Sequence, residues 1–101
     1  MDTAIAIVNL TVTESETDDQ TTLETLAAWR GCRLAKVLTI DANTYMPTTL
    51  ITHTAHTTGA TTILAPSLAH FGTATKALTL ACTLVVPHAV IPRIPGWTPN
   101  P

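Results

Sequence analysis

The feature that most constrains this chain is a short apolar run near its start, from Ala4 to Leu10, which only Asn9 interrupts. Its length, its branched side chains and the polar residues that follow are typical of a strand. Strands that are apolar on both sides occur in parallel sheets whose two faces are covered by helices. The run therefore predicts a central strand of such a sheet.

A polar loop at 11–17 and a helix are expected after this strand. Asp18 or Asp19 is expected to cap the helix, because a short acidic side chain accepts its first amide hydrogens and suits the helix dipole. Gly31 is expected to end it. The residues expected on its inner side are Leu23, Leu26, Ala27 and Arg30. Trp29, beside this stripe, and Phe71, further along, are expected to be packing residues.

The middle of the chain repeats the strand and helix pattern. Residues 32–40 alternate between apolar and polar types, which predicts a strand nearer an edge, with Leu34 and Leu38 on one side. Pro47 suits the first turn of a helix, where its missing N–H costs nothing, and this helix is expected over 47–58. The residues expected to face inward or to close it are Leu50, Ile51, Thr54, Ala55 and Gly59.

The last third predicts a strand at 61–65, a loop at 66–72, a helix at 73–83 and a short strand at 89–92. The inner face of that helix is expected to hold Ala77, Leu80, Ala81 and Leu84. The alternation of strands and helices predicts an α/β fold in three layers, α/β/α, with a mainly parallel sheet of four to five strands. The expected domain is 1–93, and 94–101 is a proline-rich tail.

Composition sets limits on function. The 101 residues suffice for one domain, only 12% of them are charged, and the net charge is −2 with no basic patch, so DNA binding is not expected. No apolar run is long enough for a membrane helix, and a cytoplasmic protein is expected. Cys32 and Cys82 are expected to be reduced core thiols. His53 and His56 share a helix face without a third ligand, so no metal or other cofactor is expected.

Four segments carry a family resemblance: IVNLT at 7–11, QTTLETLAAWRG at 20–31, Met46-Pro47, and LAHFGTA at 68–74. In this order they resemble the end of the first strand, the glutamine-led helix, the start of the second helix and the segment after the third strand in serine recombinases. The resemblance is to the catalytic domain of that resolvase/invertase family and spans residues 4 to about 93. It implies a resolvase-like fold.

The resemblance also implies a degenerate active site, that is, a pseudoenzyme. The family's serine nucleophile corresponds to Thr11. The positions of its arginines and its acidic residue correspond to Asn9, Met46, His70, Thr73 and Ala69, so no arginine remains. Phosphoryl transfer depends mainly on positioning and charge stabilisation, so this chain is expected not to be an enzyme. The family's DNA-crossing helix would begin beyond Arg93, where the proline-rich tail stands.

Two functions remain open. The first is a protein-interaction or regulatory module, working as a homodimer or with a protein partner. Because residues 78–94 hold only one charge, the third helix, the last strand and the tail with Trp97 are its expected surface. The second is a small-molecule or phosphate-binding site, read as a cryptic phosphoryl-transfer site, at the loops after the first and third strands. Its expected residues are Thr11, Thr13, Ser15, Ser67 and His70, although acidic neighbours oppose an anion.

Overall fold

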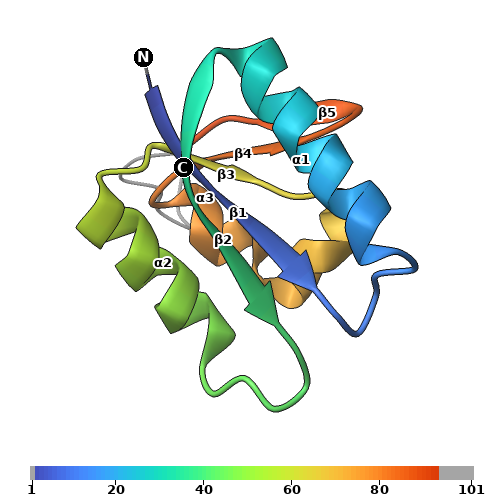
Figure 1. Ribbon diagram of the computed structural model, residues 1–101. Helices are drawn as coiled ribbons and strands as arrows, with labels where there is room; N and C mark the ends of the chain where they lie inside the picture. Colours follow the sequence, from blue (N-terminus) through green and yellow to red (C-terminus); the bar gives the residue numbers. More distant parts are fainter. Residues whose placement is uncertain (1, 94–101) are drawn as a thin grey trace.

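The computed structural model describes residues 2–93 (Figure 1). Helices and strands alternate as far as residue 86, as the sequence predicted, and a further strand then follows without a helix between. Their bounds are β1 Asp2–Asn9, α1 Glu16–Arg30, β2 Cys32–Ile40, α2 Pro47–Thr58, β3 Thr62–Leu64, the 3₁₀ segment η1 Leu68–Ala74, α3 Thr75–Thr79, β4 Thr83–Val86 and β5 Ala89–Ile91. None of the helices in this part of the chain combines the length and apolarity that crossing a membrane would require.

The five strands form one mixed sheet in the order β2-β1-β3-β4-β5. The pairs between the first four strands are parallel, and β5 runs antiparallel to β4 after a tight turn at Pro87 and His88. The predicted class, an α/β fold with a mainly parallel sheet, is confirmed. The prediction that 32–40 forms an edge strand is also confirmed, because β2 ends the sheet.

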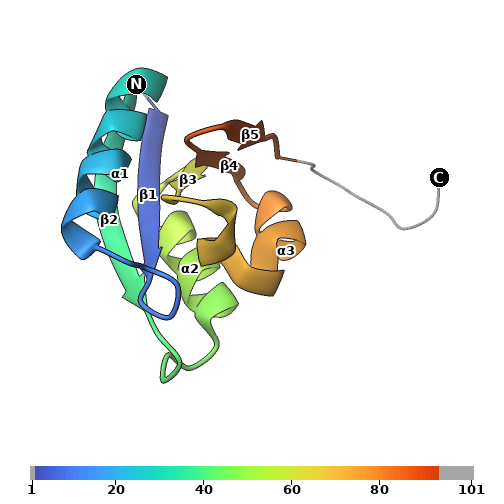
Figure 2. The same ribbon diagram turned by 90° about the vertical axis from the view of Figure 1, so that its right-hand side faces the viewer.

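Helices cover both faces of the sheet (Figures 1 and 2): α1 lies on one face, and α2 and α3 lie on the other. The strand β1 serves both layers, because successive side chains of a strand point to opposite sides. Ile5 and Ile7 belong to the cluster on the α2 side, whereas Ala6 packs with Leu23 on the α1 side. Ile5, Ala6 and Ile7 are fully buried, as predicted for a central strand.

An irregularity in β2 changes which side chains face which helix. The register with β1 shifts between Ala4 and Ile5, so that Ala4 pairs with Leu34 and Ile5 pairs with Lys36. Leu34 therefore packs against the α1 side, and Leu38 belongs to the cluster on the α2 side. The prediction that Leu34 and Leu38 share a side is wrong, because one extra residue in a strand reverses the alternation.

The predicted helix over 73–83 is also wrong in extent. Its first part is η1, α3 covers only Thr75–Thr79, and the missed strand β4 begins at Thr83. Leu84 is fully buried within that strand, but Leu80 is 45% exposed. The sequence TLVV is rich in branched residues and is covered on both sides, which favours a strand over a helix. The predicted strand at 89–92 corresponds to β5.

This correction alters the expected interaction surface. The strand β4 lies between β3 and β5, and five apolar residues after Lys76 lie in the core, whereas Leu80 and Val90 are exposed. The buried ones are Leu78, Cys82, Leu84, Val85 and Val86. Trp97 and the rest of the proline-rich tail lie outside the described residues.

The helix ends follow local chemistry. Gly31 and Gly59 end α1 and α2 in the left-handed conformation, with φ of 66° and 71°, as predicted. The cap of α1 is Ser15, whose Oγ accepts the Asp18 N–H at 3.3 Å, so the prediction of an aspartate cap is wrong.

The inner faces of α1 and α2 are mostly as predicted. Arg30 and Leu50 were expected to face inward but are exposed, and the buried residues are Leu23, Leu26, Ala27, Ile51, Thr54 and Ala55.

The many threonines of the helices bond to their own backbone. The hydroxyl of Thr54 donates to the Leu50 carbonyl at 2.8 Å, and that of Thr58 donates to the Thr54 carbonyl at 2.7 Å. Such bonds satisfy the hydroxyl but do not favour a helix, so packing must hold α2 in place. The buried side chains Ile51 and Ala55 provide this packing.

Candidate functional site

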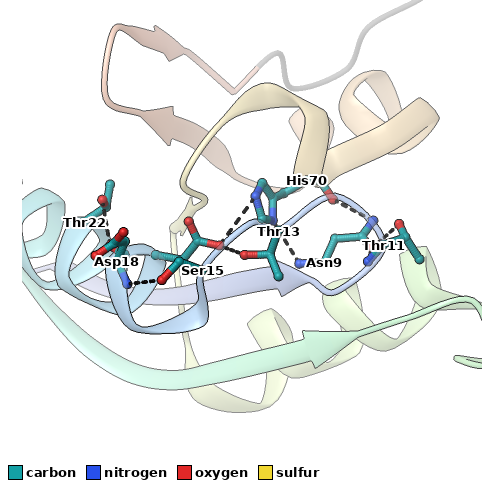
Figure 3. Close-up of polar contacts among 8 residues, drawn as sticks. Asn9, Thr11, Thr13, Ser15, Asp18, Thr22 and His70 are labelled. Atoms are coloured by element: carbon teal, nitrogen blue, oxygen red, sulfur yellow. Dashed lines mark hydrogen bonds and ion pairs between the residues drawn. The ribbon is translucent and has the colours of Figure 1, made fainter.

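The loops that follow β1 and β3 meet at the carboxyl edge of the sheet, where ligands of such folds usually bind. Figure 3 shows His70, carried by η1, beside Asn9 at the end of β1. Five polar residues make contact there, and we name them the edge cluster: Asn9, Thr11, Thr13, Asp19 and His70.

The imidazole of His70 is the centre of the edge cluster. Only 4% of its surface is exposed, although the sequence placed it in a loop. The backbone N–H of Asn9 donates to its Nδ1 at 2.9 Å (Figure 3). A ring nitrogen that accepts a hydrogen bond carries no proton, so neutral His70 must carry its hydrogen on Nε2.

The other side of the ring faces α1. Its Nε2 lies 4.0 Å from an Oδ2 of Asp19, and the hydroxyl of Thr13 donates to the same oxygen. Burial lowers the pKa of His70 below its ordinary value of 6.5, and the charge of Asp19 opposes this shift. At neutral pH the ring is therefore uncharged, and it joins β1, η1 and the first turn of α1.

The resemblance places Thr11 at the position of a nucleophile, and in the structure the hydroxyl of Thr11 is already hydrogen-bonded. Both its Oγ1 and its N–H donate to the side-chain oxygen of Asn9, at 2.6 and 3.0 Å. An amide oxygen is not basic enough to remove the proton of an alcohol, so this contact positions the hydroxyl without activating it. The lone pair of His70 is not available either, because the Asn9 N–H occupies it.

A small hollow of about 180 Å³ lies beside the edge cluster, between η1 and the start of α2. Three of the six positions that the resemblance singles out line it: Asn9, His70 and Thr73. Met46 adjoins it in sequence, is 53% exposed and has a φ of 48°, a conformation that residues other than glycine seldom adopt. Ala69 is exposed and does not line this hollow.

The predicted ligand residues are only partly brought together. Thr11, Thr13 and His70 lie in the edge cluster, but the Oγ of Ser15 caps α1. Ser67 lines a different hollow, with Pro87 and the β4–β5 turn. The side chains of Thr11, Thr13, Ser15 and His70 each already have a polar partner within the protein.

The charges around this edge oppose an anion. Asp19 belongs to the cluster, and Glu14, Glu16 and Asp18 stand in the loop before α1 or in its first turn. The residues that line the hollow include no lysine or arginine. A phosphate placed there would meet carboxylates and uncharged groups rather than the cations that stabilise a phosphoryl transfer.

Sequence reasoning missed the part that Asp19 plays. It was assigned to the helix cap, although its carboxylate instead accepts from Thr13 and faces His70. The sequence did contain a signal for this role. Asp19 lies in the first turn of the helix that follows the polar loop, and this turn starts at the same edge of the sheet where β1 ends. The partner that sequence could not supply is the backbone N–H of Asn9.

The histidines and cysteines outside the edge cluster do not form a metal site within the described residues. His53 and His56 are both exposed, and residues 2–93 contain no group of three or more potential ligands that could hold a metal ion. Cys32 is half-buried, Cys82 is buried, and both are free thiols.

Comparison with known proteins gives no match to a family model, to a curated protein or to a solved structure.

Proposed function

We propose that this chain is a non-catalytic recombinase-like domain that works as a protein-interaction or regulatory module. The observation that carries the proposal is the state of the edge cluster. Its hydroxyl, amide and imidazole groups bond to one another, and no cation lines the hollow beside it. The mainly parallel sheet, with the loops after β1 and β3 meeting at one edge, also fits the resemblance.

The missing rate acceleration is large. Removing one preorganised hydrogen-bond donor from an oxyanion site typically costs about 10²–10³ in rate, and here every position that corresponds to an arginine holds another residue. The remaining candidates, Thr11 and His70, are each hydrogen-bonded to a different part of Asn9 rather than to each other. A nucleophile and base that do not meet cannot work as a pair.

The test for catalysis is the formation of a covalent protein–DNA adduct. The intact protein would be incubated with nicked and paired crossover-type duplexes and then denatured, with Thr11→Ala as the matched control. The proposal predicts no adduct with either protein. An adduct that forms with the intact protein and disappears in Thr11→Ala would overturn it.

The surface that supports an interaction lies between α1 and the β4–β5 turn. A groove of about 300 Å³ is open there, and we name it the α1 groove; it is lined by Thr21, Thr22, Thr25, Leu26, Trp29 and Pro87. Trp29 is 65% exposed, so the prediction that it is a packing residue is wrong, whereas Phe71 is 4% exposed and the prediction for it is confirmed. Exposed aromatic residues beside a groove are enriched where proteins bind one another.

The expected partner is a second copy of the chain, with another protein as the second candidate. Light scattering at micromolar concentration distinguishes these. A dimer that becomes a monomer in Trp29→Ser would support self-association through the α1 groove. A strictly monomeric chain would leave only a heteromeric module.

The alternative function is the binding of a phosphate or another small molecule beside His70. The hollow of about 180 Å³ at the first turn of α2 favours it, because Thr48 and Thr73 contribute to the lining. Binding to the folded form must raise the melting temperature, and the rise must grow with ligand concentration. A panel of inorganic phosphate and nucleotides that leaves the melting temperature unchanged would end this alternative.

A further inference from the structure

We infer that His70 is an acid-operated latch, which holds η1 against the end of β1 when neutral and releases it toward α1 when protonated. The inference is independent of the proposed function, because it concerns contacts among residues of the fold itself. It rests on the opposite character of the two groups that the imidazole faces: a hydrogen-bond donor on one side and a carboxylate on the other.

The first step is the loss of one contact. Neutral His70 accepts the Asn9 N–H on Nδ1, and both nitrogens of a protonated imidazole are donors. Two donors cannot share a hydrogen bond, so protonation removes the 2.9 Å contact between η1 and β1. The Asn9 side chain donates to the carbonyl of His70 at 3.5 Å, which is too long to hold the turn by itself.

The second step is the gain of another contact. Protonation turns the 4.0 Å approach between Nε2 and Asp19 into an attraction between opposite charges. Asp19 is the charged group that acts on the imidazole from α1. The other neighbours are uncharged: Asn9 from β1, and Pro47, Thr48 and Ile51 of α2, which line the same hollow; η1 has no second titratable side chain.

The backbone provides a place for the movement. Gly72 interrupts η1 with φ 58° and ψ −130°, so the turn that carries His70 is separated from the rest of the segment by a residue free to change conformation. The β1 side of the latch is fixed, because the Leu10 N–H donates to the Ile40 carbonyl at 2.8 Å and the Asn9 carbonyl accepts from Val12 and Thr13. The turn at 68–71 is therefore the part that moves.

The consequence is a change in the hollow beside the latch. Asn9, His70, Phe71 and Gly72 all contribute to its lining. Movement of the imidazole from Asn9 toward Asp19 moves His70 away from Asn9, and both residues line the hollow. Acidification would therefore open the hollow of about 180 Å³ without unfolding the sheet behind it.

The test is a pH titration of the intact chain followed by nuclear magnetic resonance. The expected result is that the Asn9 amide shifts and loses protection from hydrogen exchange with the same midpoint as the protonation of His70, and that Phe71 and Gly72 follow. The histidines His53, His56 and His88 provide internal controls, because they are exposed and lie outside the edge cluster.

Two variants separate the latch from a purely structural role. In Asp19→Asn the carboxylate is replaced by an amide that can still accept from Thr13, and the protonation midpoint of His70 should fall, because the charge of Asp19 raises the pKa of the imidazole. In His70→Asn the side-chain oxygen stands at the same number of bonds as Nδ1, so it can accept from Asn9 without titrating. The Asn9 amide of that variant should no longer respond to pH.

Two results would overturn the latch. One is an Asn9 amide that stays unchanged while His70 takes up its proton. The other is a His70 that stays neutral until the whole protein unfolds. Both are read from the unsubstituted chain, so the inference stays testable even if His70→Asn does not fold.

Discussion

The edge cluster and the α1 groove differ in the way their side chains are used. In the edge cluster, Asn9, Thr13 and His70 all have partners within the protein, and His70 is only 4% exposed. In the α1 groove, Trp29 is 65% exposed and contacts Arg30 across 6.0 Å, an exposed cation–π distance. The region that a catalytic motif would occupy is closed by internal bonds, and the region expected to be packed is open.

This difference indicates where each kind of substitution should act. Changes in the edge cluster should affect the stability of the fold, because its hydrogen bonds join segments distant in sequence. Changes in the α1 groove should affect association and leave the fold intact. Four predictions test this division, in order of decreasing effect on stability.

The largest effect is expected for His70→Ala. The substitution removes a buried ring and leaves the Asn9 N–H without its partner. The free energy of unfolding should fall by about 2–4 kcal/mol, from the unsatisfied donor and the cavity together. Urea unfolding measures it, with His88→Ala, which changes an exposed histidine, as the control. Equal effects of the two substitutions would contradict the prediction.

The second prediction concerns pH. The pKa of His70 is lowered by burial, so the unfolded chain takes up a proton near the ordinary value of 6.5 and the folded chain only at lower pH. Between these two values the unfolded state holds more protons, and the free energy of unfolding should fall as pH falls through this window. Urea unfolding from pH 7.5 downward measures it. The part of the decrease due to His70 should disappear in His70→Asn.

The third prediction concerns the cap of α1, next to the edge cluster. Ser15→Ala removes the oxygen that accepts the Asp18 N–H. The free energy of unfolding should fall by about 1 kcal/mol, as for other caps of this kind. Thr17→Ala is the control, because Thr17 is an exposed residue two positions further along the chain. This substitution should change the free energy of unfolding by less than about 0.5 kcal/mol. A larger effect of the control would indicate that the cap lies elsewhere.

The smallest effect on stability is expected in the α1 groove. Trp29→Ser should change the free energy of unfolding by less than about 0.5 kcal/mol, because most of the indole is exposed. The same substitution should abolish any self-association seen by light scattering. Tyr45→Ser is the matched control, since Tyr45 is an aromatic residue that is 86% exposed and does not line the groove. If association were lost only in Tyr45→Ser, the interface would lie at the loop between β2 and α2 and not in the α1 groove.

The sequence was informative where one local rule determined the structure. Gly31, Gly59 and Pro47 stand at helix ends whose chemistry few other residues satisfy, and the bounds of α2 are as predicted. The apolar run in β1 identified a strand covered on both sides. Local rules failed where tertiary context decides, as in the register shift of β2 and in the run of apolar residues that becomes α3 and β4.

The sequence predicted where the candidate site lies in the fold but not which groups contact one another there. The order of strands and helices indicates that the loops after β1 and β3 share an edge, and the contact between Asn9 and His70 confirms this. The partners of His70 could not be predicted, because one is a backbone N–H that carries no sequence signal and the other, Asp19, resembled a helix cap. The exposure of Trp29 depends on what covers α1, which its own sequence does not encode.

The central claim is that the imidazole of His70 is a structural acceptor and is not available as a base. The most direct measurement is the through-hydrogen-bond coupling between the amide nitrogen of Asn9 and Nδ1 of His70, in a ¹⁵N-labelled sample at neutral pH. The account predicts a measurable coupling and a ring that carries its hydrogen on Nε2. A ring protonated on Nδ1, with no coupling to Asn9 and a free lone pair on Nε2 beside Asp19 and Thr13, would contradict it.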